Sequence, residues 1–317
     1  MAPVNHSDVL EFILIGFPGL PEKFYSLVSI SFFLIYNVSL YVNLIVVVLL
    51  LLSRHLHQPM YVIIGNLSVS DLLFDTLTLP KIISKYWLGD GSLSYTACFI
   101  QLFFVHYLGT LDAYIFMVMA IDRYIAICKP LRYHSIISNR LVAIICLVLW
   151  IFVAAMVLLV IAPGLMLPFR GTNRVKSCFC SFDAVTVLSY VDTASSRRTR
   201  YLIAMMSHLC PLSFIVYSYV IIIQKICSSS RTENWRKAFY TCTTHWLFIG
   251  LYFIPRLAIY AYNQLQLNPD NDLSVFLICL YTFAPHFTSP IIFCLRTEQI
   301  RRTLSKVLKW NIIYHKY

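Results

Sequence analysis

Charge is what this sequence has least of. Asp, Glu, Lys and Arg together make up 12% of its 317 residues, whereas about a quarter of an average soluble chain is charged. So few charges cannot cover a water-exposed surface, and most of the chain is therefore expected to face lipid. The same shortage, beside 59% hydrophobic residues, excludes a disordered chain, a coiled coil and a compact disulfide-rich secreted module.

Acidic residues are scarcer than basic ones. The 14 Asp and Glu stand against 25 Lys and Arg, which gives a net charge of +11. In a soluble chain such an excess would point to nucleic acid as a partner. In a membrane chain it indicates basic cytoplasmic loops instead, so we expect membrane lipid and no nucleic acid around this protein.

Motifs that carry catalysis are also missing. The sequence has no Gly-rich phosphate loop, His-x-x-x-His pair, Cys-x-x-Cys pair or nucleophile elbow, so we do not expect an enzyme. Residues 1–24 hold Asp8, Glu11 and Glu22 and lack a basic segment before an apolar core. This is not the pattern of a cleaved signal peptide, and the first apolar helix is the expected insertion signal.

Long apolar stretches are abundant. Seven of them are long enough to cross about 30 Å of hydrocarbon as helices. They cover residues 25–52, 59–82, 98–127, 141–163, 201–226, 238–262 and 273–295. The sequence therefore predicts an all-α membrane protein built as a seven-transmembrane helix bundle.

Basic residues near the helix ends set the orientation. Lys and Arg follow helices one, three and five and lie in the tail, so these regions are expected to face the cytoplasm. The loop between helices four and five is also basic, but long loops weigh less in this rule. We predict an extracellular N-terminus over 1–24, a membrane domain over 25–295 and a cytoplasmic tail over 296–317. Asn5, in Asn5-His6-Ser7, then becomes an expected glycosylation site of a multi-pass cell-membrane protein.

Three cysteines fall on the oxidising, extracellular side: Cys98, Cys178 and Cys180. Cys98 opens helix three, so a bridge to either cysteine of the long loop would pin that loop over the mouth of the bundle. One thiol of the three remains unpaired.

Several motifs are specific enough to indicate a family. They are 56–61 (LHQPMY), 66–72 (NLSVSDL), 119–128 (MAIDRYIAIC), 129–133 (KPLRY) and 237–245 (KAFYTCTTH). These blocks closely resemble the vertebrate odorant receptors, which are rhodopsin-like G-protein-coupled receptors. The stretch 78–87 (TLPKIISKYW) looks most like receptors of fish. The resemblance covers nearly the whole chain and implies an olfactory receptor.

The resemblance implies a switch for a stimulatory olfactory G protein at the cytoplasmic end of helix three. Its residues would be Asp122, Arg123, Tyr124 and, on helix six, His245. Asp122 could hold the permanently charged guanidinium of Arg123 at rest, and its release would expose a contact for the partner. The alternative is an interfacial Arg that reaches toward lipid phosphates. The resemblance also implies a Cys98–Cys180 disulfide, which leaves Cys178 as the odd thiol.

Asp71 and Asp112 lie deep inside helices two and three, where a charge is costly and usually functional. Together with Ser289 they would suit a sodium ion that favours the inactive bundle. In the alternative, one carboxyl is protonated and hydrogen-bonded to the other. Asp75, one turn from Asp71, could join either network. We expect no other cofactor.

The resemblance places a small odorant between helices three, five, six and seven. The matching residues are Val105, His106, Gly109, Thr110, Phe253, Arg256 and Tyr260. Val105 is apolar where amine receptors carry an acid, which argues against an amine ligand.

Arg256 shares one helical face with Phe253 and Tyr260. A guanidinium there would suit a carboxylate or another small anion. The alternative for Arg256 is that its side chain reaches outward or pairs with Asp270 or Asp272. The alternative for His106 is that it is only a packing residue.

Two departures from the family qualify this interpretation. Ser289 and Phe293 stand where odorant receptors carry Asn and Tyr in their Asn-Pro-x-x-Tyr motif, which puts coupling efficiency in doubt. A receptor that folds but couples weakly is therefore one alternative. A transporter or channel is another, although the chain has no internal repeat.

Residues 296–310 alternate basic and apolar types, which predicts a short amphipathic eighth helix. A disordered basic tail is the alternative.

Overall fold

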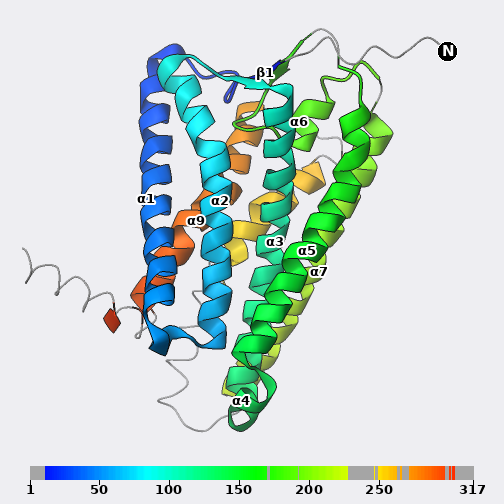
Figure 1. The fold of residues 1–317 in the computed structure, drawn as a ribbon. Helices are drawn as coiled ribbons and strands as arrows, with labels where there is room; N and C mark the ends of the chain where they lie inside the picture. The colour runs from blue at the N-terminus through cyan, green and yellow to red at the C-terminus, as the bar shows by residue number, and fades with distance from the viewer. Residues whose placement is uncertain are drawn as a thin grey trace, which may run out of the picture.

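The computed structural model describes residues 11–169, 172–191, 193–227, 246, 249–262, 265, 271–296, 300, 302 and 303. Long helices run side by side to form a bundle, with short strands and a small helix at its extracellular end (Figure 1). Six of the described helices are long and apolar enough to cross a membrane, and Ile249–Tyr262 is a shorter apolar helix. They lie in the seven stretches that the sequence predicts.

The helices are α1 (Tyr25–Leu52), α2 (Pro59–Leu88), α3 (Tyr95–Cys128), α4 (Tyr133–Ile136), α5 (Asn139–Ile161), α6 (Phe182–Thr186), α7 (Ala194–Cys227) and α9 (Asn271–Arg296). Six of the helices are long and overlap predicted apolar stretches, whereas α4 and α6 are short and lie in the connections between them. Counted as the seven predicted apolar stretches, α5 is helix four, α7 is helix five, Ile249–Tyr262 is helix six and α9 is helix seven.

Local signals explain where several helices begin and end. Ser94 caps α3 by accepting a hydrogen bond from the backbone N–H of Ala97, and Ser138 caps α5 in the same way through Leu141. α2 continues through Pro80 and stops at Gly89, whose φ of 77° is the left-handed conformation typical of a helix C-terminus. The sequence prediction ended this helix at residue 82, before Ser84 and Lys85.

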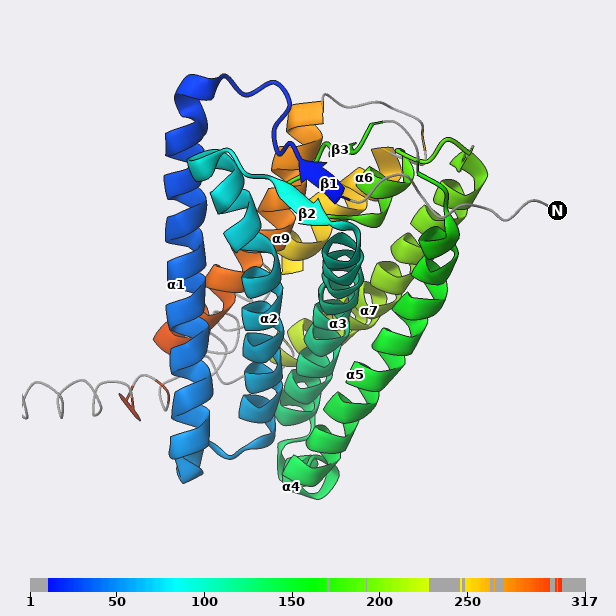
Figure 2. The ribbon, with the colours of Figure 1, turned by 45° about the horizontal axis from the view of Figure 1, so that its top comes forward.

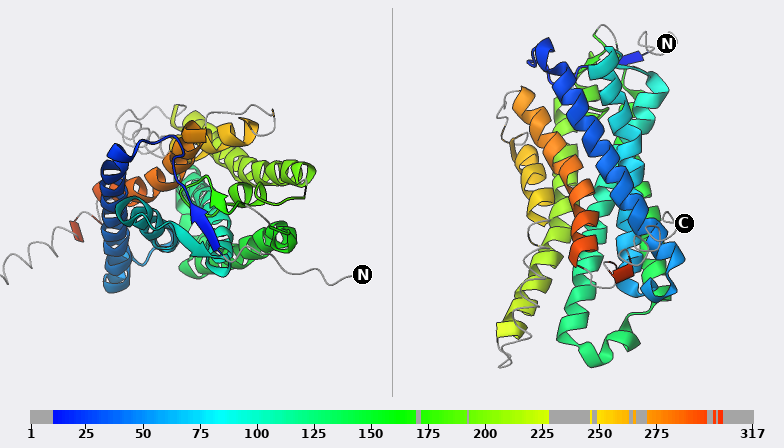
Figure 3. Two further views of the ribbon diagram at one scale, coloured as in Figure 1. Left: turned by 90° about the horizontal axis from the view of Figure 1, so that it is seen from above. Right: turned by 90° about the vertical axis from the view of Figure 1, so that its left-hand side faces the viewer.

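α3 is the central helix of the bundle. It contacts α2, α5 and α7, and the view from above shows it between the α1–α2 side and the α5–α7 side (Figure 3). In its most apolar window 67% of residues are buried within the protein, against 22% for α1 and for α5. α3 therefore reaches both ends of the bundle from its interior, while α1 and α5 present apolar side chains outward, as expected for helices that face lipid.

A small three-stranded sheet covers the extracellular end, and the sequence does not predict it. β1 (Glu11–Leu14) pairs antiparallel with β2 (Ser92–Ser94) and parallel with β3 (Arg174–Val175) (Figure 2). Phe12 and Leu14 alternate with more exposed neighbours and are fully buried. The strands have two to four residues, too few for a periodic signal. The sheet ties the N-terminal segment to the long loop between α5 and α7.

Most of the predicted eighth helix lies outside the described residues. Ile300, Arg302 and Thr303 are helical, and a ring nitrogen of His55, after α1, lies 2.8 Å from the hydroxyl of Thr303. Asn5 and His245 also lie outside the described residues, so their predicted roles stay predictions.

Candidate functional site

A cavity opens beneath α6 at the extracellular end of the bundle. It holds about 590 Å³ of space, including its open side. Its walls come from α3, α5, α6, α7 and helix six. The lining residues are His106, Thr110, Met156, Val157, Val160, Ile161, Phe182, Asp183, Arg200, Tyr201, Ile203, Ala204, Ser207, His208 and Tyr260. The lining residues from α5 are therefore all apolar, whereas α3, α6, α7 and helix six contribute polar and charged groups.

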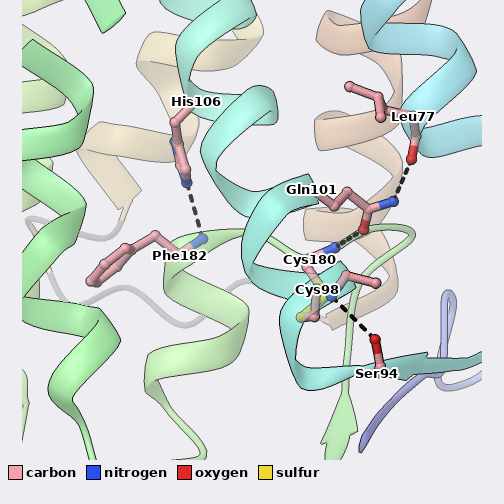
Figure 4. Close-up of a disulfide and its surroundings, with 8 residues drawn as sticks. Leu77, Ser94, Cys98, Gln101, His106, Cys180 and Phe182 are labelled. Carbon is pink, nitrogen blue, oxygen red and sulfur yellow. Dashed lines mark hydrogen bonds between the residues drawn. A yellow bond between two sulfur atoms is a disulfide. The ribbon is translucent and has the colours of Figure 1, made fainter. Parts of the chain in front are cut away.

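The segment of the long loop that covers this cavity is bonded to α3 at three points (Figure 4). Cys98 forms a disulfide with Cys180 of the long loop, the pairing that the resemblance implied. The side chain of Gln101 accepts a 2.7 Å hydrogen bond from the backbone N–H of Cys180 and donates one to Leu77 of α2. Nε2 of His106 accepts a 3.0 Å hydrogen bond from the backbone N–H of Phe182. His106 thus serves as both a lining residue and a packing residue.

Arg200 is the cation of the cavity lining. Among the described residues, its buried Nε and Nη2 have no hydrogen-bond partner. Its guanidinium carbon lies 3.9 Å from the centre of the Phe182 ring, a cation–π contact that fixes the plane of the guanidinium. Buried donors of a charged group are rarely left unpaired, so a ligand acceptor could complete this environment.

Among the described residues that line the cavity, Asp183 is the only acidic one. Burial raises the pKa of its carboxyl to about 6, although a hydrogen bond from Tyr201 and the charges of Arg200 and Arg197 oppose the rise. The balance of charge in the cavity therefore depends on pH near neutrality.

Arg256, the predicted anion ligand, lies one layer behind the cavity. It is 6% exposed and donates hydrogen bonds to the carbonyl of Gly109 and the hydroxyl of Tyr252, at 2.8 and 2.9 Å. Its Nη1 also lies 2.8 Å from Nε2 of His208. Within the described part of the chain no carboxylate forms a salt bridge with Arg256. Arg256 thus faces the bundle, and Asp272, one of its alternative partners, accepts instead from the backbone N–H of Gly19.

His208 links Arg256 to the cavity. Its Nδ1 lies 2.8 Å from the carbonyl of Ala204, which can only accept a hydrogen bond. Nδ1 therefore carries the proton, and Nε2 can accept from Arg256. This tautomer places a neutral ring between a buried cation and the cavity.

Of the seven predicted pocket residues, three line the cavity: His106, Thr110 and Tyr260. Val105, Gly109 and Phe253 are packed among the helices, with Gly109 beneath the guanidinium of Arg256.

Sequence reasoning missed Asp183, Arg200 and His208 as lining residues, and it also missed the contribution of helix four. The basic character of 197–200 was a usable signal, because these charges precede a long apolar helix on its extracellular side.

A second polar cluster lies near the middle of the bundle. His286 of α9 places Nδ1 2.7 Å from Asp75, and its Nε2 lies 3.7 Å from both Asp71 and Asp112. These four residues are at most 3% exposed. One ligand atom from each of Asp71, Asp112 and His286 lies within 4.8 Å of the others, as in a metal site.

Hydroxyl groups complete this midplane cluster. Ser39 donates to Asp75 at 2.5 Å, Ser70 donates to Asp112 at 2.7 Å, and Ser289 donates to Asp71 at 3.3 Å. The predicted ion ligands Asp71, Asp112 and Ser289 therefore lie together. Sequence reasoning overlooked His286, although it shares a helical face with Ser289, three residues away.

Known proteins resemble this chain over most of its length. A family model described as olfactory receptor matches residues 32–310. The chain is 32% identical to olfactory receptor 1500 of Rattus norvegicus over 304 residues, 96% of either chain. It is 34% identical to olfactory receptor 10D3 of Mus musculus over 306 residues, also 96% of either chain. Identity to olfactory receptor 2AT4 of Homo sapiens is 31% over 94% of this chain and 92% of that one.

This chain belongs to the olfactory receptor family. The predicted family, the seven-helix fold and the multi-pass membrane location are therefore confirmed. Olfactory receptors are G-protein-coupled signalling receptors and not enzymes, so the prediction of a non-enzymatic protein is confirmed by family membership as well.

The cytoplasmic end of α3 carries the three described residues of the predicted G-protein switch, Asp122, Arg123 and Tyr124. Asp122 is 3% exposed and accepts a 2.8 Å hydrogen bond from the hydroxyl of Tyr133. That contact and burial together raise the pKa of the Tyr133 phenol. Among the described residues Asp122 forms no salt bridge with Arg123, and Nε of Arg123 is buried without a hydrogen-bond partner. The contact that holds Asp122 is thus made by Tyr133 of α4.

Helix seven of this olfactory receptor ends in the variant motif that the sequence shows. Ser289 is 2% exposed and contributes its hydroxyl to Asp71, so it keeps a polar link between helices two and seven. The side chain of Phe293 lies outside the described residues.

Proposed function

We propose that this olfactory receptor binds a small carboxylate, or a related organic anion, in the cavity beneath α6. The observation that carries the proposal is the guanidinium of Arg200, which lines the cavity and has two nitrogens without a hydrogen-bond partner among the described residues. Arginine matches a carboxylate with two parallel hydrogen bonds. The apolar wall of Met156, Val157, Val160 and Ile161 would contact the hydrocarbon part of the odorant.

The charges around the cavity support an anion over a cation. Arg200 lies in the lining and Arg256 lies behind His208, whereas Asp183 is the single acid of the lining. The apolar Val105 removes the acidic anchor that an amine would need.

Signalling would run from this cavity to the cytoplasmic end through α3 and helix six. Ligand contacts on His106, Thr110 and Tyr260 would favour one arrangement of these helices. The rearrangement would open the region around Arg123 and His245 to a stimulatory olfactory G protein. Cavity and G protein would then be coupled sites on one bistable bundle.

A weakly coupling receptor is the second candidate, because Ser289 and Phe293 replace the usual Asn and Tyr. The binding proposal would be unchanged, and ligand-dependent nucleotide exchange would be small. Restoring the usual residues with Ser289→Asn and Phe293→Tyr would raise exchange only if this candidate is right.

For the midplane cluster we propose a single positive charge shared by Asp71, Asp75 and Asp112. His286 would supply it as an imidazolium, and a sodium ion would compete for Asp71 and Asp112. The position of Nε2, 3.7 Å from both carboxylates, supports the imidazolium, because it lies where an ion would bind. Either cation would favour the inactive arrangement if activation compresses this region.

The test of the binding proposal is cyclic AMP in cells that express the receptor with olfactory G protein. Surface expression is measured in parallel, and pooled carboxylates, amines and neutral odorants are applied. We expect a response to acids, with the half-maximal concentration rising roughly 10- to 100-fold in Arg200→Gln, since a charge-assisted hydrogen bond contributes about 1.5–3 kcal/mol.

Arg198→Gln is the matched control, because Arg198 lies on the same turn of α7 but is exposed. An equal loss in both variants, or a response only to amines or neutral odorants, would contradict the anion proposal while leaving the receptor assignment intact.

A further inference from the structure

The sulfur of Cys178 lies 3.3 Å from the sulfur of Cys279. Cys178 belongs to the long loop and is fully buried, whereas Cys279 belongs to α9 and is half-buried. The two residues are 101 positions apart in the sequence, so only the fold brings them together. Neither is the partner of Cys98.

The loop around Cys178 is held in place independently of this contact. The carbonyl of Ser177 accepts a hydrogen bond from the backbone N–H of Gly16. The ring of Phe179 packs edge-on against Phe74 of α2 and Phe283 of α9. Cys180 is bonded to Cys98. Cys178 is therefore presented to α9 by a segment with contacts on both sides.

We propose that Cys178 and Cys279 form a second disulfide, which joins the long loop to helix seven. A disulfide has sulfurs about 2.05 Å apart, so the pair needs to approach by only about 1.3 Å. Both thiols lie toward the extracellular end, which faces the oxidising lumen during biosynthesis.

The reaction needs an oxidant, and a lumenal protein disulfide would supply it. The Cys279 thiol, the more exposed of the two, loses its proton and attacks that disulfide, which releases one sulfur of the oxidant as a thiolate. The Cys178 thiolate then attacks the Cys279 sulfur and displaces the second sulfur of the oxidant. Two protons and two electrons leave the receptor, and the oxidant departs as a dithiol. Burial raises the pKa of the Cys178 thiol, which is consistent with Cys279 reacting first.

The second bridge would make one covalent path from helix three to helix seven. The path runs Cys98, Cys180, Phe179, Cys178, Cys279, with a single residue between the two bridges. Two residues beyond Cys279, the ring of Tyr281 lies 4.7 Å from the guanidinium of Arg256. Oxidation would therefore hold the extracellular end of helix seven against the residues behind the cavity.

The experiment counts free thiols on the intact, full-length receptor. Cells are lysed in N-ethylmaleimide, and the purified, denatured receptor is weighed by mass spectrometry. Because the chain has ten cysteines, one bridge leaves eight labelled thiols and two bridges leave six. We expect six labels, and peptide mapping should join the peptide of Cys279 to that of residues 178–180.

Eight labels, with Cys178 and Cys279 among the labelled residues, would overturn the proposal. So would six labels with Cys279 labelled. Cys279→Ser should free Cys178 and add one label relative to the wild type, whereas Cys210→Ser, at an exposed free cysteine, should remove one. The wild-type count decides the question even if a variant fails to fold, and it does not depend on the ligand.

Discussion

The cavity and the midplane cluster both combine histidine with charged side chains, but they differ in how completely their groups are paired. In the midplane cluster every carboxylate accepts a hydrogen bond from a serine, and His286 approaches all three acids. Among the described residues, one buried carboxylate oxygen of this cluster, Oδ2 of Asp112, has no hydrogen-bond partner, whereas in the cavity two buried nitrogens of the single Arg200 guanidinium have none. A paired network stabilises one arrangement of helices, whereas unpaired donors in a lined cavity indicate a place for a ligand.

Buried Arg256 and half-buried Arg200 show the same difference at the level of single residues, since one nitrogen of Arg256, Nε, and two nitrogens of Arg200 have no hydrogen-bond partner among the described residues. Arg256 contacts Gly109, Tyr252 and His208 and is enclosed by the rings of Tyr252 and Tyr281. Arg200 has a single ring beneath it and faces the cavity. The sequence argument favoured Arg256 as the anion ligand because helix periodicity locates a face. Periodicity does not tell which groups on that face are already paired.

Removal of His286 should give the largest effect. In His286→Leu the three carboxylates keep their burial and lose their cationic neighbour, and a buried charge left without its partner costs about 3–5 kcal/mol. We expect a large fall in the melting temperature of the purified receptor and loss of surface expression. Thr288→Val is the matched control, because Thr288 bonds only to backbone carbonyls of its own helix. Equal stability of the two variants would show that His286 carries no charge in the cluster.

The sequence predicted the helices well because hydropathy and capping are local. The stretch 25–52 coincides with α1, and the ends of α3 and α5 differ from the prediction by one to three residues. The sheet of β1, β2 and β3 was not predicted, because its pairing joins residues near 12, 93 and 174, and no local pattern encodes such a contact.

The candidate site was predicted in part, and the reason is again locality. His106, Thr110 and Tyr260 follow from helix faces, and Asp71, Asp112 and Ser289 follow from polar residues in apolar runs. Asp183 lies in the long loop under the Cys98–Cys180 bridge, and Arg200 lies just before the apolar stretch that begins at residue 201, so both fall in the segment that the sequence assigns to the loop. Their roles could not be read from spacing, since a loop of this length has no period.

Substitution of each of the two arginines by glutamine, in separate variants, should distinguish a role in stability from a role in ligand recognition. Arg256→Gln removes the charged donor to Gly109 and His208, so we expect about 1.5–3 kcal/mol less stability and reduced surface expression. Arg200→Gln should leave the melting temperature nearly unchanged and reduce acid potency. Thermal melting of both variants, beside their dose–response curves, is the measurement. If Arg256→Gln melts like the wild type and loses only potency, then Arg256 and not Arg200 is the anion ligand.

Protonation of Asp183 should tune the cavity over a narrow pH range. The pKa is raised to about 6, so the carboxylate is ionised at pH 7.5 and largely neutral at pH 5. Loss of this negative charge favours an anion, and potency should therefore rise as pH falls, by roughly three- to tenfold for one charge at moderate distance.

An alkyl sulfonate should serve as the probe for this pH dependence, because it stays ionised throughout. His106 of α3 and His208 of α7 also face the cavity and could gain charge in the same direction, so Asp183→Asn is the decisive comparison. It should respond at pH 7.5 as the wild type does at pH 5, with little further change. A pH profile that survives unaltered in Asp183→Asn would assign the effect to the histidines.

Sodium should have the smallest effect, and its size measures how far His286 already fills the cation's role. In the wild type, replacing sodium by choline should change basal and ligand-induced nucleotide exchange by less than about twofold, because the imidazolium competes for Asp71 and Asp112. In the milder variant His286→Asn, the amide leaves both carboxylates available, and sodium should then raise the melting temperature and lower basal exchange. A strong sodium effect in the wild type that does not grow in His286→Asn would show that the ion and the histidine bind side by side, and that the midplane cluster holds two cations instead of one.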